Sequence, residues 1–309
     1  LVALGVSRTS AAAVIATTCC LDLGPSSSNA MRAADLCNMD VVTYFVQGQG
    51  PVALCTIASV AIGHFFVQRW FDKKEGALAN KEDTKESALD VDKALEGAGP
   101  AYYAILPMLP LGLLIGFSPL VYKAIKLNLV TAIIVSLIIA LVVDIATRRD
   151  FKQCCKDSQA IFEGMGKVST VSLIVCAEMF ALGLNKIGGI STMIQAAASI
   201  QNAGLFIMLI VMLVIMIVAA IVTGSGNAAF FAFSPLLPEA ASSVGIPTLA
   251  LAVPVQLSAG IARTMSPIAG VIIAVSGITG LTPIALIRRT IPVMIIAVIV
   301  SVTSSLIFL

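Results

Sequence analysis

Charged residues are scarce in this chain. Of its 309 residues, 12% are Asp, Glu, Lys or Arg and 58% are hydrophobic, with a mean hydropathy of +1.00. Soluble domains average about 25% charged residues, so this composition excludes an ordinary soluble domain. The net charge of +2 and the lack of a basic patch with interleaved aromatic residues argue against a nucleic-acid partner. We therefore expect an all-α integral membrane protein that is surrounded by the lipid bilayer.

Catalytic and metal-binding motifs are also missing. The sequence holds one histidine, His64, and its seven cysteines form no C-x-x-C pair, so no metal site is expected. It has no Ser-His-Asp set, no H-E-x-x-H motif and no phosphate-binding loop. Hydrolysis and ATP-driven transport therefore lack support, and we expect a protein that is not an enzyme and holds no cofactor. The position of His64 in its apolar run predicts that it lies at a helix end.

The chain does contain long apolar runs. A membrane-spanning helix takes about 20 such residues, and several near-continuous runs approach that length. The strongest are 52–67, 102–117, 127–143, 168–184, 205–222, 249–276 and 291–309. The segment between the first two carries fourteen charged residues of mixed sign, which predicts a solvated loop.

The parts before and after this loop resemble each other weakly. Pro25 recurs as Pro267 and Pro51 as Pro292, at an offset between 240 and 242 residues. Most Lys and Arg residues, including the pair 288–289, fall on the side of the charged loop, which the positive-inside rule assigns to the cytoplasm. This topology gives the two halves opposite orientations. We therefore predict an inverted-repeat secondary transporter with re-entrant hairpins and broken transmembrane helices.

The repeat predicts three parts of the chain. Residues 1–68 are the C-terminal part of the first inverted repeat, 69–100 are the cytoplasmic charged loop, and 101–309 are the second repeat. Within the second repeat we predict a re-entrant hairpin at 205–243 and a broken helix at 248–276. If the halves match, roughly 140 further residues of the first repeat belong before Leu1, so we expect a truncated N-terminus.

Three polar clusters interrupt the apolar runs. One lies at the hairpin tip, one in the broken helix, and one at the equivalent place in the front half. Non-helical backbone at membrane depth survives only where it is buried in protein or lines a cavity, and carriers bind their substrates at such breaks. The candidate substrate-binding residues are Thr223, Gly224, Ser225, Gly226 and Asn227; Arg263, Thr264, Ser266 and Pro267; and Gly24, Pro25, Ser26, Ser27, Ser28 and Asn29.

Arg263 indicates the charge of the ligand. An arginine in the hydrocarbon core costs roughly 2.5 kcal/mol or more, and its planar fork suits a carboxylate. The structural alternative is an ion pair with Asp22 or Glu178. A helix that starts near Asn227 would direct its positive end at the same anion, the alternative being a polar surface turn that Asn227 caps.

Asp22 and Glu178 are candidates for ion coupling, with Na⁺ or H⁺ as the ion. Glu178 lies in the middle of the run 168–184 and Asp22 directly precedes the front cluster. On the sequence alone Asp22 is a Na⁺ site, a proton site or the charge partner of Arg263. For the front cluster, the alternative to a binding role is an ordinary N-cap, Ser28 or Asn29, of the following helix.

Five stretches carry a resemblance to a known family. They are Gly63–Glu75, Tyr103–Pro107, Thr223–Ala228, Gly260–Pro267 and Arg289–Val293. They are similar to the C-type anaerobic C4-dicarboxylate carriers of the ion transporter superfamily, over nearly the whole chain. Asp22 departs from the resemblance, because an apolar residue is expected in its place.

The resemblance implies a multi-pass carrier of the bacterial inner membrane that exports succinate or exchanges it for fumarate or malate. It also implies a hairpin and a broken helix in each of two inverted repeats, and a homodimer. One alternative is a carrier of the same fold for another organic anion, or a Na⁺/H⁺ exchanger in which carboxylates dominate the site instead of Arg263. A membrane enzyme would need a nucleophile–base pair, and a scaffold would not need two broken helices.

Overall fold

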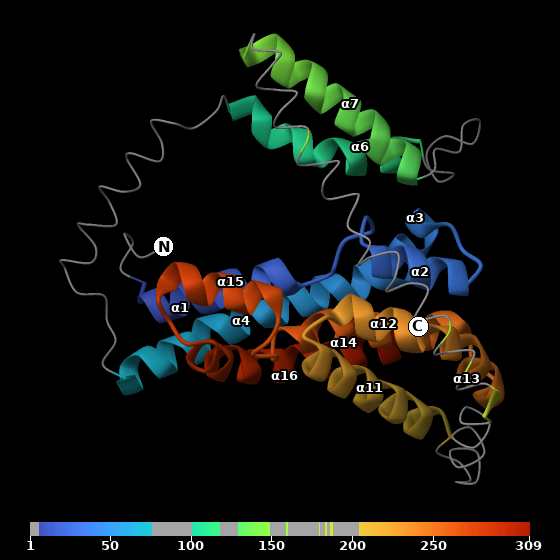
Figure 1. Ribbon diagram of the computed structural model, residues 1–309. Helices are drawn as coiled ribbons and strands as arrows, with labels where there is room; N and C mark the ends of the chain where they lie inside the picture. The colour runs from blue at the N-terminus through green and yellow to red at the C-terminus, as the bar shows by residue number, and fades with distance from the viewer. Residues whose placement is uncertain are drawn as a thin grey trace.

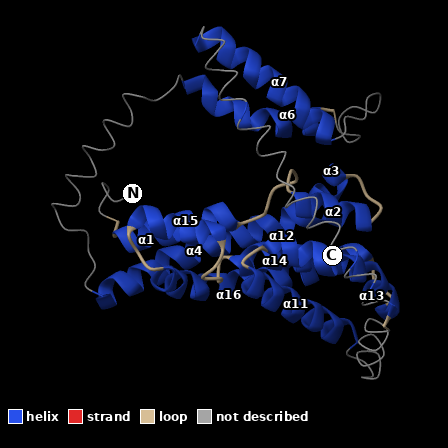
Figure 2. Ribbon diagram, viewed as in Figure 1, coloured by secondary structure: helices blue, strands red, loops and turns tan. Residues whose placement is uncertain are grey.

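The computed structural model describes residues 6–75, 101–117, 129–148 and 204–309, together with five single residues between 159 and 187. Within these residues every regular element is a helix and no strand occurs (Figure 2). The all-α prediction is therefore confirmed for the part of the chain that the structure describes.

The helices fall into three stretches of the chain. The first holds α1 (Arg8–Cys20), α2 (Ser28–Leu36), α3 (Val41–Tyr44), the π-helical turn η2 (Phe45–Gln49) and α4 (Gly50–Glu75). The second holds the 3₁₀-helix η3 (Ala101–Met108), α6 (Leu109–Gly116) and α7 (Leu129–Arg148). The third holds α11 (Gly204–Thr223), α12 (Gly226–Phe233), η4 (Ser234–Leu236), α13 (Leu237–Val244), α14 (Thr248–Arg263), α15 (Gly270–Thr279) and α16 (Pro283–Phe308).

Three helical segments of the described chain are long and apolar enough to cross a membrane. They are Val41–Lys74, Phe206–Thr223 and Pro283–Phe308, with mean hydropathies of 1.8, 3.2 and 2.5. Large apolar side chains cover their outer faces, among them Leu54, which is 70% exposed, and Ile299, which is 57% exposed. Lipid is the natural solvent for such faces, so the chain is a membrane protein.

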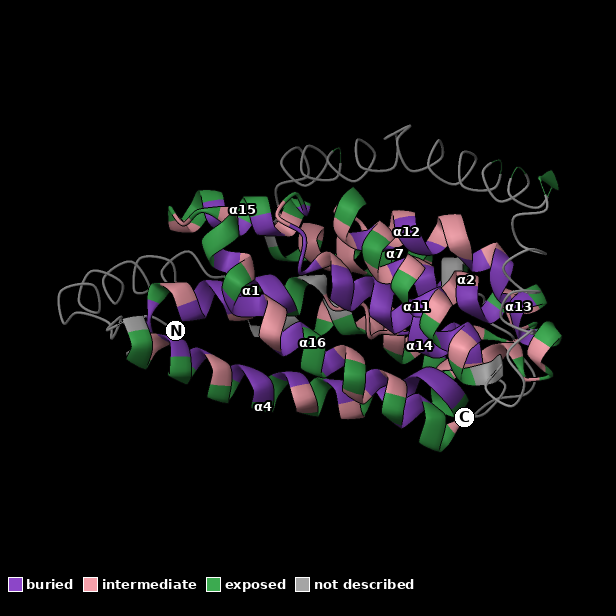
Figure 3. Cartoon of the chain, turned by 90° about the horizontal axis from the view of Figure 1, so that it is seen from below, coloured by how far each residue is buried: buried purple, intermediate pink, exposed green. Residues whose placement is uncertain are grey.

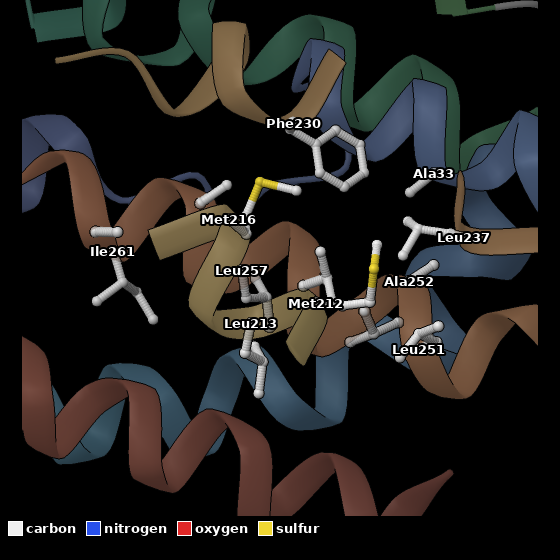
Figure 4. Packing of buried hydrophobic residues seen from close by; sticks show 14 of the residues in the cluster. Ala33, Met212, Leu213, Met216, Phe230, Leu237, Leu251, Ala252, Leu257 and Ile261 are labelled. Atoms are coloured by element: carbon white, nitrogen blue, oxygen red, sulfur yellow. The ribbon is translucent and has the colours of Figure 1, made fainter. Parts of the chain in front are cut away.

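Helix α14 lies at the centre of the bundle (Figures 1 and 3). All of its residues from 251 to 262 are buried, and it packs against α2, α11, α12 and α16. Small residues at these contacts, such as Ala259, let the neighbouring backbones approach closely. Figure 4 shows Met212 and Met216 of α11 in the apolar cluster that also holds Phe230 of α12.

Helix α4 extends further than the apolar pattern indicated. It continues to Glu75, so residues 69–75 of the predicted loop are helical. His64 therefore lies inside α4 and not at its end, and that prediction is wrong. The imidazole is buried, with Nε2 3.0 Å from Thr17 Oγ1 and Nδ1 3.2 Å from Gln68 Nε2. Polar partners of this kind allow the helix to continue beyond its apolar run.

A buried ion pair joins α4 to α16. Arg289 is only 2% exposed, and its Nη1 lies 2.7 Å from Asp72 Oδ1. Ser10 of α1 donates to Asp72 Oδ2 at 2.8 Å and accepts from Arg289 Nη1 at 2.8 Å, while Ser7 donates to Asp72 at 2.7 Å. Arg289 is thus buried instead of solvated with Arg288, because the last turns of α4 supply its counter-ion.

Replacing Asp72 by Leu should destabilise the fold more than replacing Asp72 and Arg289 together by Leu and Met. The single change leaves a buried guanidinium without this counter-ion, which costs about 3–5 kcal/mol, whereas removing both charges is often neutral. Thermal unfolding in detergent, followed by size-exclusion chromatography, measures both variants. An equal loss of stability in the two variants would show that the ion pair is not a structural link.

Candidate functional site

The polar clusters predicted from the sequence meet beside α14. We call residues 21–29, from the end of α1 to the first two residues of α2, the first break, and residues 264–269, between α14 and α15, the second break. Residues 223–227, where α11 turns into α12, are the tip. Asn227 Nδ2 of the tip donates to Ser28 Oγ at the start of α2, at 3.3 Å. The tip also packs against the second break and against α14.

Glycines allow the tip to come this close. A Cβ on Gly226 would lie 2.5 Å from the carbonyl oxygen of Ala259 in α14, which no side chain can accommodate. A Cβ on Gly224 would lie 3.0 Å from the backbone of Ile268 in the second break. Gly224 also has a φ of 68°, in the left-handed region that favours glycine. The Gly-Ser-Gly sequence of the tip is therefore a requirement of its packing.

Ser225 caps helix α12. Its Oγ accepts from the backbone N–H of Ala228 at 3.2 Å, so the interpretation of Asn227 as the cap is wrong. Thr223 is exposed and donates to the carbonyl oxygen of Ala219 at 2.7 Å. Because Ser225 provides the cap, the side chain of Asn227 is left to reach the first break.

Asp22 of the first break lies against the face of α14 that carries Arg263. A Cβ on Gly260 would lie 3.0 Å from the Cβ of Asp22, and residues three apart share one helix face. Arg263 Nη2 donates to the carbonyl oxygen of Cys19, at the end of α1, at 3.4 Å. Asp22 and Arg263 therefore border the same face of α14, and the roles that the sequence left open for Asp22 stay predictions.

Other side chains of the first break surround the same carboxylate. Ser27 caps α2, since its Oγ accepts from Ala30 N at 2.9 Å. The cap is therefore Ser27, one residue before the expected Ser28 and two before the expected Asn29. Asn29 is fully buried and faces Asp22, and its amide atoms have no hydrogen-bond partner among the residues that the structure describes.

Gly24, Pro25 and Ser26 form the middle of the first break. Pro25 is buried, Gly24 is half-buried and Ser26 is exposed. Proline has no backbone N–H to donate and glycine favours no helix, so these residues keep α1 and α2 apart.

Gln49 is a site residue that the sequence reasoning missed. It is fully buried in the π-helical turn η2, and its Nε2 makes long hydrogen bonds, of 3.5 Å, to the carbonyl oxygens of Asp22 and Gly24. Its Oε1 has no partner within the described part of the chain. Single π-helical turns are rare and often mark functional sites. The available signal was the polar Gln-Gly-Gln-Gly sequence of residues 47–50 inside an apolar segment.

The second break buries its hydroxyl groups. Thr264 and Ser266 are both inaccessible to solvent. The carbonyl oxygen of Thr264 accepts from Thr290 Oγ1 at 3.1 Å, whereas its own Oγ1 has no partner in the described structure. Ser266 Oγ accepts from Ile268 N at 3.4 Å, and Pro267 is half-buried. Thr264 therefore adds a polar group to the site, while Ser266 mainly stabilises the turn.

A cavity of about 1030 Å³ extends along α1 and α4 to the first break. Its lining includes Asp72, Gln68 and His64 on α4, Thr18 on α1, and Gly24. The charged end of α4 and the candidate site thus border the same space.

Glu178 lies outside the described residues, so its role as a coupling site stays a prediction. Within the residues that the structure does describe, no three His, Cys, Asp or Glu side chains gather in an arrangement that could hold a metal ion. The groups at the site are one guanidinium, one carboxylate, amides, hydroxyls and backbone groups. Such groups are suited to binding a polar ligand, and the described residues of the site include no nucleophile–base pair.

Two comparisons with known proteins identify the same family. The family described as "DcuC: C4-dicarboxylate anaerobic carrier" matches residues 1–308. The chain is 33% identical to the anaerobic C4-dicarboxylate transporter DcuC of Escherichia coli K12 over 313 residues, covering 99% of this chain and 65% of that protein. It is 33% identical over 291 residues to a protein of Vibrio cholerae named probable anaerobic C4-dicarboxylate transporter DcuC, covering 93% of this chain and 61% of that protein. The chain thus spans less than two thirds of the length of these relatives, which are named transporters and not enzymes.

Replacing Gly226 by Ala should separate the tip from α14. Overpacking a tight contact costs about 1–3 kcal/mol, and here the obstacle is a backbone carbonyl that cannot rotate away. The matched control is Gly277→Ala in α15, where a Cβ would meet no atom within 4 Å and alanine favours the helix. Thermal unfolding in detergent should show a clear loss for the first variant and none for the second. Similar unfolding temperatures for both variants would contradict the close packing of the tip.

Proposed function

Because the chain belongs to the DcuC family of anaerobic C4-dicarboxylate carriers, we propose that it forms the substrate-binding part of a secondary transporter for dianionic C4 acids. The transporter acts in the bacterial inner membrane as a multi-pass protein. It exports succinate or exchanges succinate for fumarate or malate. The observation that carries this proposal is the meeting of two helix breaks and a glycine-rich tip beside one arginine.

Arg263 binds one carboxylate of the substrate. Its guanidinium offers a planar fork of donors that matches a carboxylate. It lies at the C-terminal end of α14, next to the second break, where the side chain is half-buried and not sealed in the core. A cation in this position can exchange its protein partners for a substrate carboxylate.

The second carboxylate is held between the tip and the first break. Asn227 and Ser28 already lie within 3.3 Å of each other there, and Asn29 and Thr264 bring buried polar atoms that lack partners in the described residues. Helices α2 and α12 begin at Ser28 and Gly226, so their positive ends face this region. Two anchoring points suit a dicarboxylate better than a monocarboxylate.

Alternating access follows from the inverted-repeat architecture that the sequence predicts. In this scheme 205–243 is a re-entrant hairpin, and the moving unit carries the whole site across the membrane without any covalent chemistry. The large apolar outer surface of the bundle contacts lipid and, in a homodimer, the second copy. No cofactor takes part, and H⁺ or Na⁺ provides the coupling.

The alternative is a Na⁺/H⁺ exchanger or a carrier for another organic anion with the same fold. Asp22 is the feature that favours cation binding, because it places a carboxylate at the site. Arg263, which follows one turn after the contact of Asp22 with Gly260 on α14, argues against a cation exchanger, since a cation would meet a nearby fixed positive charge.

The test is a transport assay in proteoliposomes with the protein expressed from its complete reading frame. Labelled succinate outside is followed with and without fumarate inside, and with and without a Na⁺ gradient. Succinate uptake that internal fumarate stimulates is the expected result. If no dicarboxylate moves under any gradient, the substrate is a different one and the proposal fails.

Replacing Arg263 by Ala should abolish succinate transport at normal expression. Hydrogen bonds to charged groups contribute about 1.5–3 kcal/mol, so succinate binding should weaken by roughly 10- to 150-fold. Arg263→Lys keeps the charge but loses the fork, and should retain only partial activity. The matched control is Arg288→Ala, because Arg288 is exposed on α16 and its removal should leave the rate unchanged. Normal uptake by Arg263→Ala would contradict the assignment.

A further inference from the structure

Two cavities share a border at the C-terminal end of α4, which runs along the edge of the bundle (Figure 3). The first is the cavity of about 1030 Å³ that extends along α1 and α4. The second has a volume of about 950 Å³ and is lined by the last turns of α4 and by Pro292 of α16. Phe65, Arg69 and Lys73 line both cavities. These three residues follow one another at intervals of four, so they form one stripe on the surface of the helix.

The walls on either side of this stripe are mostly apolar. Val14 of α1 and Ile57 of α4 line the first cavity, and its polar residues Gln68 and Asp72 belong to the hydrogen-bond network around Arg289. Beyond the stripe, the described lining of the second cavity consists of Phe66, Val67, Trp70, Phe71 and Pro292. Walls of this kind suit hydrocarbon chains and offer little to a soluble ligand.

The stripe itself is positively charged. Arg69 and Lys73 are exposed, and neither forms an ion pair with another described side chain. Asp72 also lines the first cavity, but its carboxylate lies 2.7 Å from the guanidinium of Arg289 and is balanced by it. Two cations thus mark the border between two apolar cavities. An occupant that complements this border has an anionic group between two apolar parts.

Trp70 indicates that the stripe lies at the membrane surface. Its indole is 56% exposed, and the ammonium group of Lys74 lies 4.9 Å from the centre of the ring. Tryptophan beside lysine and arginine at the end of a spanning helix is typical of the lipid headgroup region. The spanning segment 41–74 ends here, on the side that the positive-inside rule assigns to the cytoplasm. The two cations therefore lie at the level of the phosphates of the cytoplasmic leaflet.

We propose that the end of α4 is a binding site for an anionic phospholipid of the cytoplasmic leaflet. The phosphate binds to Arg69 and Lys73, and the two acyl chains pass on either side of Phe65, one into each cavity. The chain in the first cavity fills the space that the side chains of α1 and α4 leave open. This lipid is a partner separate from the transported substrate, so the inference requires only that the chain is a membrane protein.

Native mass spectrometry of the detergent-solubilised protein, expressed from its complete reading frame, measures the bound lipid directly. Phosphatidylglycerol is the probe, and phosphatidylcholine with the same acyl chains is the neutral comparison. Each basic side chain near a membrane surface contributes about fivefold in affinity. Phosphatidylglycerol should therefore bind about 25-fold more tightly than phosphatidylcholine, and the double variant Arg69→Gln, Lys73→Gln should lose this preference.

The matched control is the double variant Arg8→Gln, Arg288→Gln. Both arginines are exposed, and neither lines either cavity. This variant removes the same total charge, so it should keep the preference for phosphatidylglycerol. An equal loss in both double variants would show general attraction to a basic protein and would overturn the site.

The role of the cavities is tested by Ala61→Phe, which places a ring at an exposed position in the lining of the first cavity. Binding of phosphatidylglycerol should fall to that of lysophosphatidylglycerol, which has a single acyl chain. Binding of the lysolipid should not change, because the second cavity is still open to its one chain. Unchanged binding of phosphatidylglycerol would contradict the placement of its chains.

A further measurement needs no variant. A ligand that binds the folded state raises the unfolding temperature, so phosphatidylglycerol should stabilise the unmodified protein more than phosphatidylcholine does, and less at high salt. Equal stabilisation by the two lipids would overturn the inference. So would displacement of the lipid by glycerol phosphate, which indicates a site for a soluble anion, or a lipid-free dimer that the Arg69→Gln, Lys73→Gln variant dissociates, which indicates a second copy. None of these measurements involves transport, so a failure of the proposed function is recognised separately.

Discussion

The close approach of two non-helical segments to one face of α14 is the constraint on which the site depends. Gly226 of the tip packs on Ala259, and Asp22 of the first break packs on Gly260. These two contacts are adjacent along α14, and Arg263 follows one turn later. A side chain larger than hydrogen at either glycine would force the segments apart. Asp22 and the tip can both lie beside Arg263 only because α14 carries small residues, Ala259 and Gly260, at this point.

Arg289 and Arg263 use their charge differently in the same bundle. Arg289 is 2% exposed and held by Asp72 and Ser10 at 2.7 and 2.8 Å. It ties α1, α4 and α16 together. Arg263 is half-buried, and its hydrogen bond to Cys19 is longer, at 3.4 Å. A half-buried cation can change partners during the proposed transport cycle, whereas Arg289 cannot do so without opening the bundle.

Local chemistry explains what the sequence could predict. Proline and glycine inside apolar runs cannot continue a helix, so the helix breaks after Cys20 and after Arg263 were visible as sequence patterns. The same holds for the glycine-rich tip. The capping residues were predicted one or two positions too late, since a cap depends on the backbone angles at a single residue. The inverted repeat and the re-entrant path of the hairpin stay predictions.

Contacts between distant segments explain what the sequence could not predict. Gln49 enters the site because η2 is packed against α14, where a Cβ on Gly48 would lie 2.8 Å from Leu249. Asp72 and Arg289 are 217 residues apart, and each looks like an ordinary cytoplasmic charge in its own segment. The site also brings Asp22 to the face of α14 that carries Arg263, which neither residue alone predicts.

The central claim is that the tip and the first break enclose the substrate, and cysteine cross-linking tests it most directly. Ser28→Cys and Asn227→Cys are introduced together into the complete protein after its native cysteines have been replaced by serine, and a short bifunctional reagent is applied with and without succinate. The side chains lie 3.3 Å apart at these positions, so a cross-link should form readily, and bound succinate should slow its formation. Failure to form the cross-link, or a rate that dicarboxylates do not change, would contradict the account.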